Sequence, residues 1–248
     1  MSDPDRRPDA SDESGDTSDT AHEASPSDAL GGALAGAARR AGLDPTGGDA
    51  TRDVVWRAMG GWRGILESVL PSLTFLVVYT LTGELLPALL LSVGIAGAFT
   101  VARLVMRSPV QAALGGLVAT GGAALLALWT GRAEDNFVLG FITNGLYGGG
   151  LLVSSLVGYS LIGLAIGFLM GEGTAWRRDR RKRRVFFWLG IAWAALFAAR
   201  LAVQLPLYAV GDVTALGTAK LAMGLPLFAP MVAVTWLAVR ALYPRRGE

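Results

Sequence analysis

The sequence predicts an all-α fold: a polytopic membrane helical bundle of about six transmembrane helices plus an interfacial or re-entrant segment, with a disordered N-terminal tail. Long apolar stretches recur between residues 65 and 242, each near the ~20 residues that a spanning helix needs. Charged residues make up 17% of the chain, against about 25% in soluble domains. A basic run, RRDRRKRR at residues 177–184, lies between two apolar stretches, which is typical of a cytoplasmic loop.

The first segment, residues 1–50, is predicted to be a disordered acidic cytoplasmic tail and linker. Its first 28 residues hold nine of the 20 acidic residues of the chain and only two arginines. Such a composition cannot bury enough apolar surface to offset the entropy lost on ordering. The pI near 9.2 therefore averages an acidic tail and a basic membrane body, and it does not indicate nucleic-acid binding.

Residues 51–63 are expected to form a juxtamembrane amphipathic segment. Arginines are interspersed there with Trp56 and Trp62, which fits a helix at the level of the lipid headgroups, and a plain loop fits as well. The transmembrane helical domain is expected over residues 64–243, and residues 244–248 form a C-terminal cytoplasmic tail.

The fourth apolar stretch has 34 residues, which are too many for one span and few for two. One span plus a half-helix is predicted, with a joint at the glycines 148–150 or at Gly158. The six expected spans are residues 65–81, 85–106, 110–130, a stretch within 137–170, 185–210 and 216–242.

The charges of the connecting segments predict the orientation. With six spans, one side of the membrane collects 14 Lys and Arg side chains, and the loops of the other side hold only Arg132. Because cytoplasmic segments carry the excess of positive charge, we expect a multi-pass plasma-membrane protein with both termini in the cytoplasm.

An acidic residue within the first span needs a reason, because charges are costly in the hydrocarbon core. Glu67 is expected near the inner end of that span, and Arg103 near the inner end of the second. The tight turn between the two spans makes these ends neighbours. We predict a Glu67–Arg103 pair, with Arg107 as the alternative partner; the other interpretation is that Glu67 faces interfacial water.

A nine-residue pattern occurs twice near the C-terminus. Residues 200–208 read RLAVQLPLY and residues 220–228 read KLAMGLPLF, with five identical positions. Each copy places a cation six residues before a proline. The copies are expected to run through the membrane in opposite directions on the fifth and sixth spans.

The repeated cations, Arg200 and Lys220, are expected in the outer half of the membrane, with Asp212 between them and Asn144 and Gln204 at a similar level. One interpretation is an outward-facing cationic pocket for an anionic headgroup or solute. The other is a kinked hairpin whose cations reach the interface or pair with Asp212.

The basic run is expected to fix the topology and to contact anionic lipid, at about 1 kcal/mol per Lys or Arg near the membrane surface. Membrane lipids are thus the expected partners, together with other membrane proteins or copies of the chain itself, and nucleic acid is not expected. The candidate lipid contacts are Arg177, Arg178, Arg180, Arg181, Lys182, Arg183 and Arg184.

Three glycines, Gly163, Gly167 and Gly171, form a stripe at helical spacing. Such a stripe is typical of a flat face that a neighbouring helix approaches closely.

The chain offers little for catalysis, because it has no cysteine and its one histidine, His22, lies in the acidic tail. The sequence shows no phosphate-binding loop, no nucleophile elbow and no zinc-protease motif. We therefore expect no catalytic residue, no cofactor and no metal site, and a protein that is not an enzyme.

Several segments together resemble an actinobacterial family of multi-pass membrane proteins, the domain of unknown function 3159. The chain is more distantly similar to the intracellular septation protein A family, in a Glu–Pro first helix, an Asp/Phe start to the fourth helix and WAALF in the fifth. The first resemblance implies no activity, and the second implies a link with the cell envelope. The segments that carry the first are residues 67–90, 109–117, 130–137, 171–181 and the two copies of the nine-residue pattern.

Two functions are compatible with these features. The first is a non-enzymatic cell-envelope scaffold or lipid-associated factor, which predicts tight helix packing. The alternative is a small-solute or ion transporter or channel with a polar site at Glu67, Arg200 and Lys220, which predicts a water-accessible pocket that reaches these residues.

Overall fold

The computed structural model describes residues 61–106 and 111–244, and these residues are mostly helical and contain no strand. Six segments of this part of the chain are long and apolar enough to cross a membrane. The predicted all-α membrane bundle is therefore confirmed. The expectations for Arg107, for the N-terminal tail and for most of the juxtamembrane segment lie outside the described residues.

Eight α-helices and two short 3-10 helices follow one another in the described residues. Their bounds are α3 Gly61–Thr82, α4 Leu85–Val105, α5 Gln111–Thr130, η1 Ala133–Phe137, α6 Val138–Leu156, α7 Leu161–Leu169, η2 Ala175–Arg178, α8 Arg180–Val210, α9 Val213–Ala222 and α10 Leu225–Leu242.

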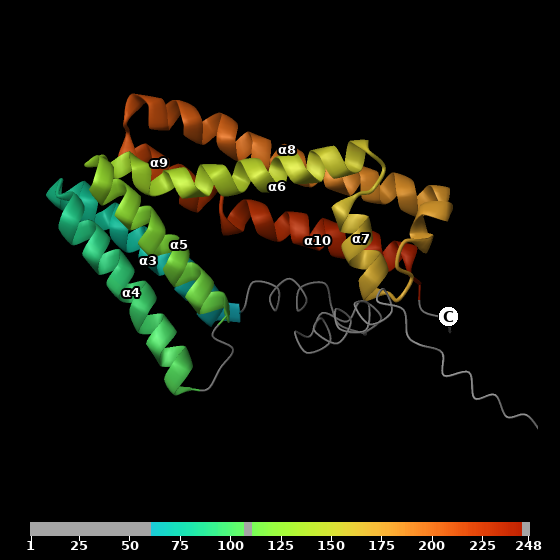
Figure 1. The fold of residues 1–248 in the computed structure, drawn as a ribbon, viewed down its shortest axis with the longest axis horizontal. Coiled ribbons are helices and arrows are strands. Elements are labelled where there is room, and N and C mark those ends of the chain that lie inside the picture. Colours follow the sequence, from blue (N-terminus) through green and yellow to red (C-terminus); the bar gives the residue numbers. More distant parts are fainter. Residues whose placement is uncertain (1–60, 107–110, 245–248) are drawn as a thin grey trace, which may run out of the picture.

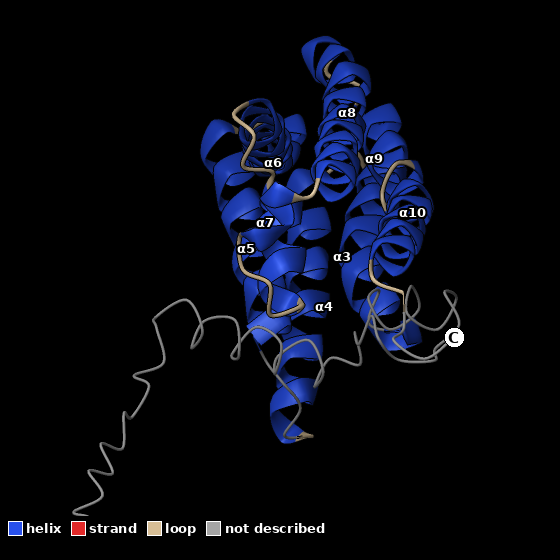
Figure 2. Ribbon diagram, turned by 90° about the vertical axis from the view of Figure 1, so that its right-hand side faces the viewer, coloured by secondary structure: helices blue, strands red, loops and turns tan. Residues whose placement is uncertain are grey.

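The helices form two groups that meet at one end of the molecule (Figure 1). The first group is α3, α4 and α5, and the second is α6, α8 and α10, which run obliquely to the first (Figures 1 and 2). The α3–α4 turn, η1 and the α8–α9 turn lie together where the groups meet, and we call this the hairpin end. The opposite end of the second group, with α7, η2 and the start of α8, is called the basic end.

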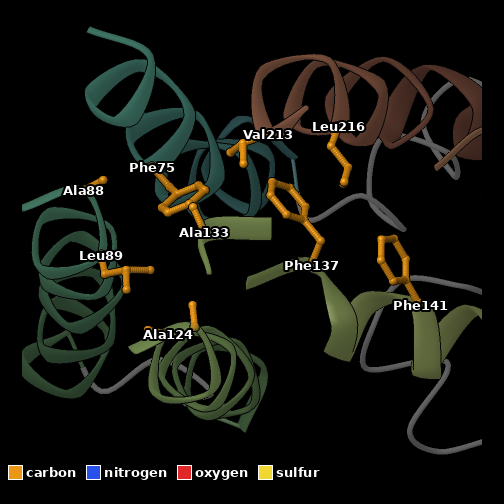
Figure 3. Close-up of a cluster of buried hydrophobic side chains, with 10 residues drawn as sticks. Phe75, Ala88, Leu89, Ala124, Ala133, Phe137, Phe141, Val213 and Leu216 are labelled. Atoms are coloured by element: carbon orange, nitrogen blue, oxygen red, sulfur yellow. The ribbon is translucent and has the colours of Figure 1, made fainter. Parts of the chain in front are cut away.

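A cluster of buried apolar side chains joins the two groups at the hairpin end (Figure 3). Phe75 of α3 meets Phe137 of η1 edge-to-face with ring centroids 5.9 Å apart, and Leu216 of α9 is fully buried in the same cluster. Many other large apolar side chains lie on the outside, such as Trp129, which is 87% exposed. Such a surface is unfavourable in water and suits contact with lipid.

The fourth apolar region forms one span and one half-helix, as predicted. The 19 residues of α6 extend about 28 Å, whereas the nine residues of α7 extend about 13 Å and cannot cross a hydrocarbon core of about 30 Å. The joint is at Gly158, whose φ of +81° suits glycine. The other proposed joint, at the glycines 148–150, is wrong because α6 continues through them.

The sixth apolar region is broken, although a single helix was expected there. Its first part, α9, ends at Ala222, and α10 begins at Leu225 after Gly224. Pro226 lies in the first turn of α10, where backbone N–H groups have no acceptor within the helix, so the absence of an N–H from proline costs no hydrogen bond. In contrast, α8 continues through Pro206 to Val210.

Candidate functional site

The basic run begins a helix, so the expectation of a loop is wrong. Its first two bases lie in η2, and the other five form the first turns of α8. Asp179 lies between the two helices and caps α8, because its Oδ1 accepts hydrogen bonds from the backbone N–H groups of Arg181 (2.7 Å) and Lys182 (3.3 Å). This acidic cap lets the helix start inside the charged run.

Three arginines of the run line a cavity of about 340 Å³ at the basic end. Arg180, Arg183 and Arg184 have the spacing of one helix face, and Phe187 follows on the same face. None of the described residues that line the cavity carries a carboxylate, so its charge is positive. The other lining residues are Ser155, Leu156, Gly158, Ser160 and Trp176.

Two buried polar groups in this lining have no hydrogen-bond partner. Ser155 is 2% exposed and its Oγ is unpartnered, and Trp176 is 1% exposed with an unpartnered Nε1. Ser160 differs, because its Oγ donates to the Phe186 carbonyl oxygen at 2.9 Å. Buried donors are normally satisfied. These two donor atoms face glycines of neighbouring helices, Gly190 and Gly167, so the cavity suits an anion through its three cations.

Lys182 points away from this cavity into a separate polar network. Its Nζ lies 2.6 and 2.8 Å from the two carboxylate oxygens of Glu172 and 4.0 Å from the Tyr243 ring centroid. The Tyr243 hydroxyl donates to Glu172 Oε2 at 2.9 Å. Burial and this hydrogen bond raise the pKa of Tyr243 above its ordinary value. The network ties the start of α8 to the end of α10 and to the turn after α7.

The remaining bases of the run do not line the cavity either. The guanidinium of Arg177 lies 3.7 Å from the Tyr159 ring centroid, which places it against the turn before α7. Arg178 and Arg181 are exposed. Arg180, Arg183 and Arg184 are exposed as well, so the seven predicted lipid contacts comprise three exposed cavity residues, two packed residues and two exposed residues outside the cavity.

The predicted Glu67–Arg103 pair is present. Arg103 Nε of α4 donates to Glu67 Oε2 of α3 at 2.8 Å, and Arg63 Nε donates to Oε1 at 2.8 Å. The Glu67 side chain is 11% exposed and that of Arg103 is 17% exposed, so the alternative of a free interfacial carboxylate is wrong. A cavity of about 450 Å³ between α3, α4 and α5 adjoins the pair, with Ser72 and Thr120 in its lining.

The two repeated cations lie on neighbouring helices, Arg200 on α8 and Lys220 on α9. These helices pack against each other and are joined by the turn at Gly211. Gln204 follows Arg200 by one helical turn and is 3% exposed. Asp212 joins neither cation in an ion pair among the described residues; its carboxylate instead caps α9, accepting from the Ala215 N–H at 2.9 Å. The predicted alternative of pairing with Asp212 is therefore wrong.

Asn144 of α6 is buried, as expected of a polar residue within a span, and is 7% exposed. It lines an apolar cavity of about 280 Å³ between α6 and α8, together with glycines of α6 and with Leu201. The structure thus places Asn144 at the α6–α8 contact, and the cavity lining includes neither Arg200 nor Lys220.

The sequence reasoning missed a polar contact at the hairpin end. The Tyr208 hydroxyl of α8 donates to Asp135 Oδ1 of η1 at 2.6 Å, and Arg132 Nε donates to Glu134 Oε1 at 2.8 Å. The hydrogen bond with Glu134 raises the pKa of Arg132, which lies between two spans. The acidic pair in TGRAED and the final aromatic of RLAVQLPLY were the available signals.

The glycine stripe receives an aromatic ring, whereas a neighbouring helix was expected. A Cβ at Gly163 would lie 2.7 Å from Trp176, and a Cβ at Gly167 would lie 2.6 Å from the same side chain. Trp176 therefore packs flat on α7 and reaches Phe186 edge-to-face, with centroids 5.2 Å apart. Gly171 lies in the turn after α7 with a φ of +73°.

The described residues contain no group of three His, Cys, Asp or Glu side chains that could hold a metal ion. The sites above contain Arg and Lys side chains, the carboxylates of Glu67 and Glu172, and the hydroxyl of Tyr243.

A family model described as "Protein of unknown function (DUF3159)" matches residues 59–246 of the chain, which include all the segments on which the resemblance rested. No curated protein and no solved structure matches the chain.

Proposed function

The chain belongs to the DUF3159 family of proteins of unknown function, and we propose that it is a non-enzymatic, lipid-associated plasma-membrane protein that binds anionic lipid headgroups at its basic end. Both termini and the basic end lie on the cytoplasmic side in this proposal, because that side collects the excess of Lys and Arg. In this proposal the protein acts in the cell envelope, as a scaffold for other membrane proteins or for copies of itself.

The cavity lined by Arg180, Arg183 and Arg184 carries this proposal. Basic residues near a membrane attract anionic lipid by about 1 kcal/mol each, wherever they point. Arginine also binds a phosphate oxygen pair through two parallel hydrogen bonds, which requires convergent side chains. Three arginines on one helix face around a cavity supply that convergence.

The site also supports the proposal that the protein is not an enzyme. Acyl or phosphoryl transfer needs a nucleophile with a base, or a metal. The cavity has Ser155 and Ser160 but no His, Lys, Asp or Glu in its described lining to activate either hydroxyl. Ser160 is further engaged with the Phe186 carbonyl.

The chain offers a matched test of the lipid proposal. Arg183→Gln/Arg184→Gln removes two exposed charges that line the cavity, and Arg178→Gln/Arg181→Gln removes two exposed charges of the same run that do not line it. Purified full-length proteins are titrated with phosphatidylglycerol or phosphatidylcholine in detergent. Retained lipid is counted by native mass spectrometry, and the apparent melting temperature is recorded.

The cavity variant should bind phosphatidylglycerol at least about tenfold more weakly than the control variant, which corresponds to about 1.4 kcal/mol. The wild type and both double variants should bind phosphatidylcholine equally. If both double variants lost the same affinity for phosphatidylglycerol, the bases would act through their total charge alone, and the proposal would be contradicted. Unchanged binding in both would contradict it too.

A second candidate function, the transport of a small solute or ion, is favoured by the cavity of about 450 Å³ beside Glu67 and Arg103. A carboxylate and arginines held inside a span are typical of substrate pathways. The test is uptake of labelled ions and amino acids into vesicles that contain the purified protein. Uptake that Glu67→Gln abolishes and Glu84→Gln preserves would support transport.

A further inference from the structure

Two cations lie deep within spans of the second helix group. At about 1.5 Å per residue, Arg200 lies about 15 Å from the end of α8 at Val210, and Lys220 lies about 10 Å from the start of α9 at Val213. The hydrocarbon core of a bilayer is about 30 Å thick. Both side chains therefore start from the apolar interior, where an isolated charge is costly.

The ammonium group of Lys220 is directed into the protein. Its Nζ lies 5.2 Å from the centroid of the Phe137 ring. Phe137 is 4% exposed and belongs to the apolar cluster at the hairpin end. A lysine that reached the headgroups would extend along the lipid-facing surface. The contact with a buried ring thus argues against that explanation for Lys220.

Two hydrogen-bond donors of α8, the helix that packs against α9, are buried without partners. The Nε of Arg200 is buried and unpartnered, as is the Nε2 of Gln204 one turn later on the same face of α8. Lys220 adds a second positive charge from α9, which packs against α8. Two like charges and an unused amide donor are a costly set of neighbours in an apolar interior, unless an acceptor joins them.

The carboxylates of the hairpin end do not supply that acceptor. Asp135 accepts from the Tyr208 hydroxyl, Glu134 pairs with Arg132, and Asp212 caps α9. Within residues 61–106 and 111–244, no ion pair includes Arg200 or Lys220. An acceptor for these groups would therefore come from outside this part of the chain.

We propose that Arg200, Gln204 and Lys220 form an intramembrane site for one phosphate-type oxyanion, which is either the phosphate group of a phospholipid or free inorganic phosphate. The three side chains present donors, and an oxyanion presents several acceptor lone pairs. The duplicated pattern RLAVQLPLY/KLAMGLPLF then has a function, since its first position supplies one cation from each of two antiparallel segments. This site is about 20 residues along α8 from the lipid cavity and does not depend on it.

The test uses full-length protein that carries Arg180→Gln/Arg183→Gln/Arg184→Gln, so that none of the three cavity arginines contributes to phosphate binding. Arg200→Met/Lys220→Met is added to remove both cations with side chains of similar length. Arg240→Met serves as the control, because Arg240 is an exposed cation in the last turn of α10. Two readouts separate the sources: phosphorus retained after purification and delipidation reports bound phospholipid, and titration with labelled inorganic phosphate reports the free anion.

The parent and the Arg240→Met protein should retain about one phospholipid, or bind inorganic phosphate with a rise in the apparent melting temperature. The Arg200→Met/Lys220→Met protein should lose that binding at least tenfold and should melt higher than the parent in the absence of anion, because an unpaired charge pair is gone. A lower melting temperature with unchanged phosphate binding would overturn the site. Failure of both readouts in the parent would also overturn it, while leaving the lipid cavity unaffected.

Discussion

Arg103 Nε lies 2.8 Å from Glu67 Oε2, and this bond joins α4 to α3 at positions 36 residues apart in sequence. The two helices are antiparallel neighbours connected by the turn at Gly83, whose φ is +68°. Arg63 approaches the other carboxylate oxygen, so that one acid is shared by two bases. Both side chains of the pair are largely buried, so the loss of one partner should lower the stability of the protein.

We predict that Glu67→Gln destabilises the protein by about 1–3 kcal/mol, because Arg103 loses its charged acceptor while remaining mostly buried. The measurement is thermal or denaturant unfolding of the purified protein in a fixed detergent. Glu84→Gln is the control, since Glu84 is exposed and belongs to no ion pair among the described residues. Similar stabilities of the two variants would contradict a structural role for the pair.

The contact of Gly167 with Trp176 leads to a second prediction. A Cβ at residue 167 would collide with the Gly173 carbonyl oxygen and with the indole ring, so Gly167→Ala should destabilise the protein by about 1–3 kcal/mol. Gly149→Ala in α6 is the matched control, because no heavy atom lies within 4 Å of its added Cβ. That substitution should be neutral or stabilising by up to about 1 kcal/mol, since alanine favours a helix. The measurement is the unfolding midpoint of each variant. Equal midpoints would show that close packing on Gly167 does not contribute to stability.

The sequence allowed the six spans and the Glu67–Arg103 pair to be predicted, because hydropathy and a tight turn are local signals. The break at Gly224 was not predictable in this way. RLAVQLPLY and KLAMGLPLF are nearly the same pattern, yet α8 passes through Pro206 while α10 starts at Leu225. Packing against other helices decides between these outcomes, and propensity alone does not.

The basic cavity could be predicted only in part, for a related reason. The run of bases was evident, but its separation into cavity, packed and exposed residues depends on three elements that are distant in sequence. Ser155 comes from α6, Trp176 from η2 and Arg183 from α8. The helical spacing of the bases could have been used, had the acidic cap at Asp179 been recognised as a helix start.

The network of Tyr243, Glu172 and Lys182 leads to a prediction about pH. The folded protein raises the pKa of Tyr243, so the phenol keeps its proton above the ordinary tyrosine value of about 10. A group whose pKa is raised by folding contributes stability that is fully present below its unfolded pKa and is lost as pH rises through the folded pKa. The apparent melting temperature of the wild type should therefore fall faster above about pH 10 than that of Tyr243→Phe.

The control for this prediction is Tyr147→Phe, because Tyr147 is 61% exposed and forms no hydrogen bond through its hydroxyl among the described contacts. Its pH profile should follow that of the wild type. Parallel profiles of the wild type and Tyr243→Phe from pH 8 to 12 would show that the phenol does not couple folding to protonation.

The proposed orientation can be tested with single cysteines, because the natural chain contains none. Glu84→Cys lies at the hairpin end, whereas Val157→Cys and Thr174→Cys lie before and after the half-helix α7; all three positions are exposed. In whole cells, a membrane-impermeant maleimide should label residue 84 at once and the other two only after permeabilisation. Nine residues cannot span the hydrocarbon core, so positions 157 and 174 must behave alike. If only one of these two positions were labelled in intact cells, the α7 region would cross the membrane. If both were labelled in intact cells, the orientation would be the reverse of the proposed one, and the basic cavity would lie outside the cytoplasm.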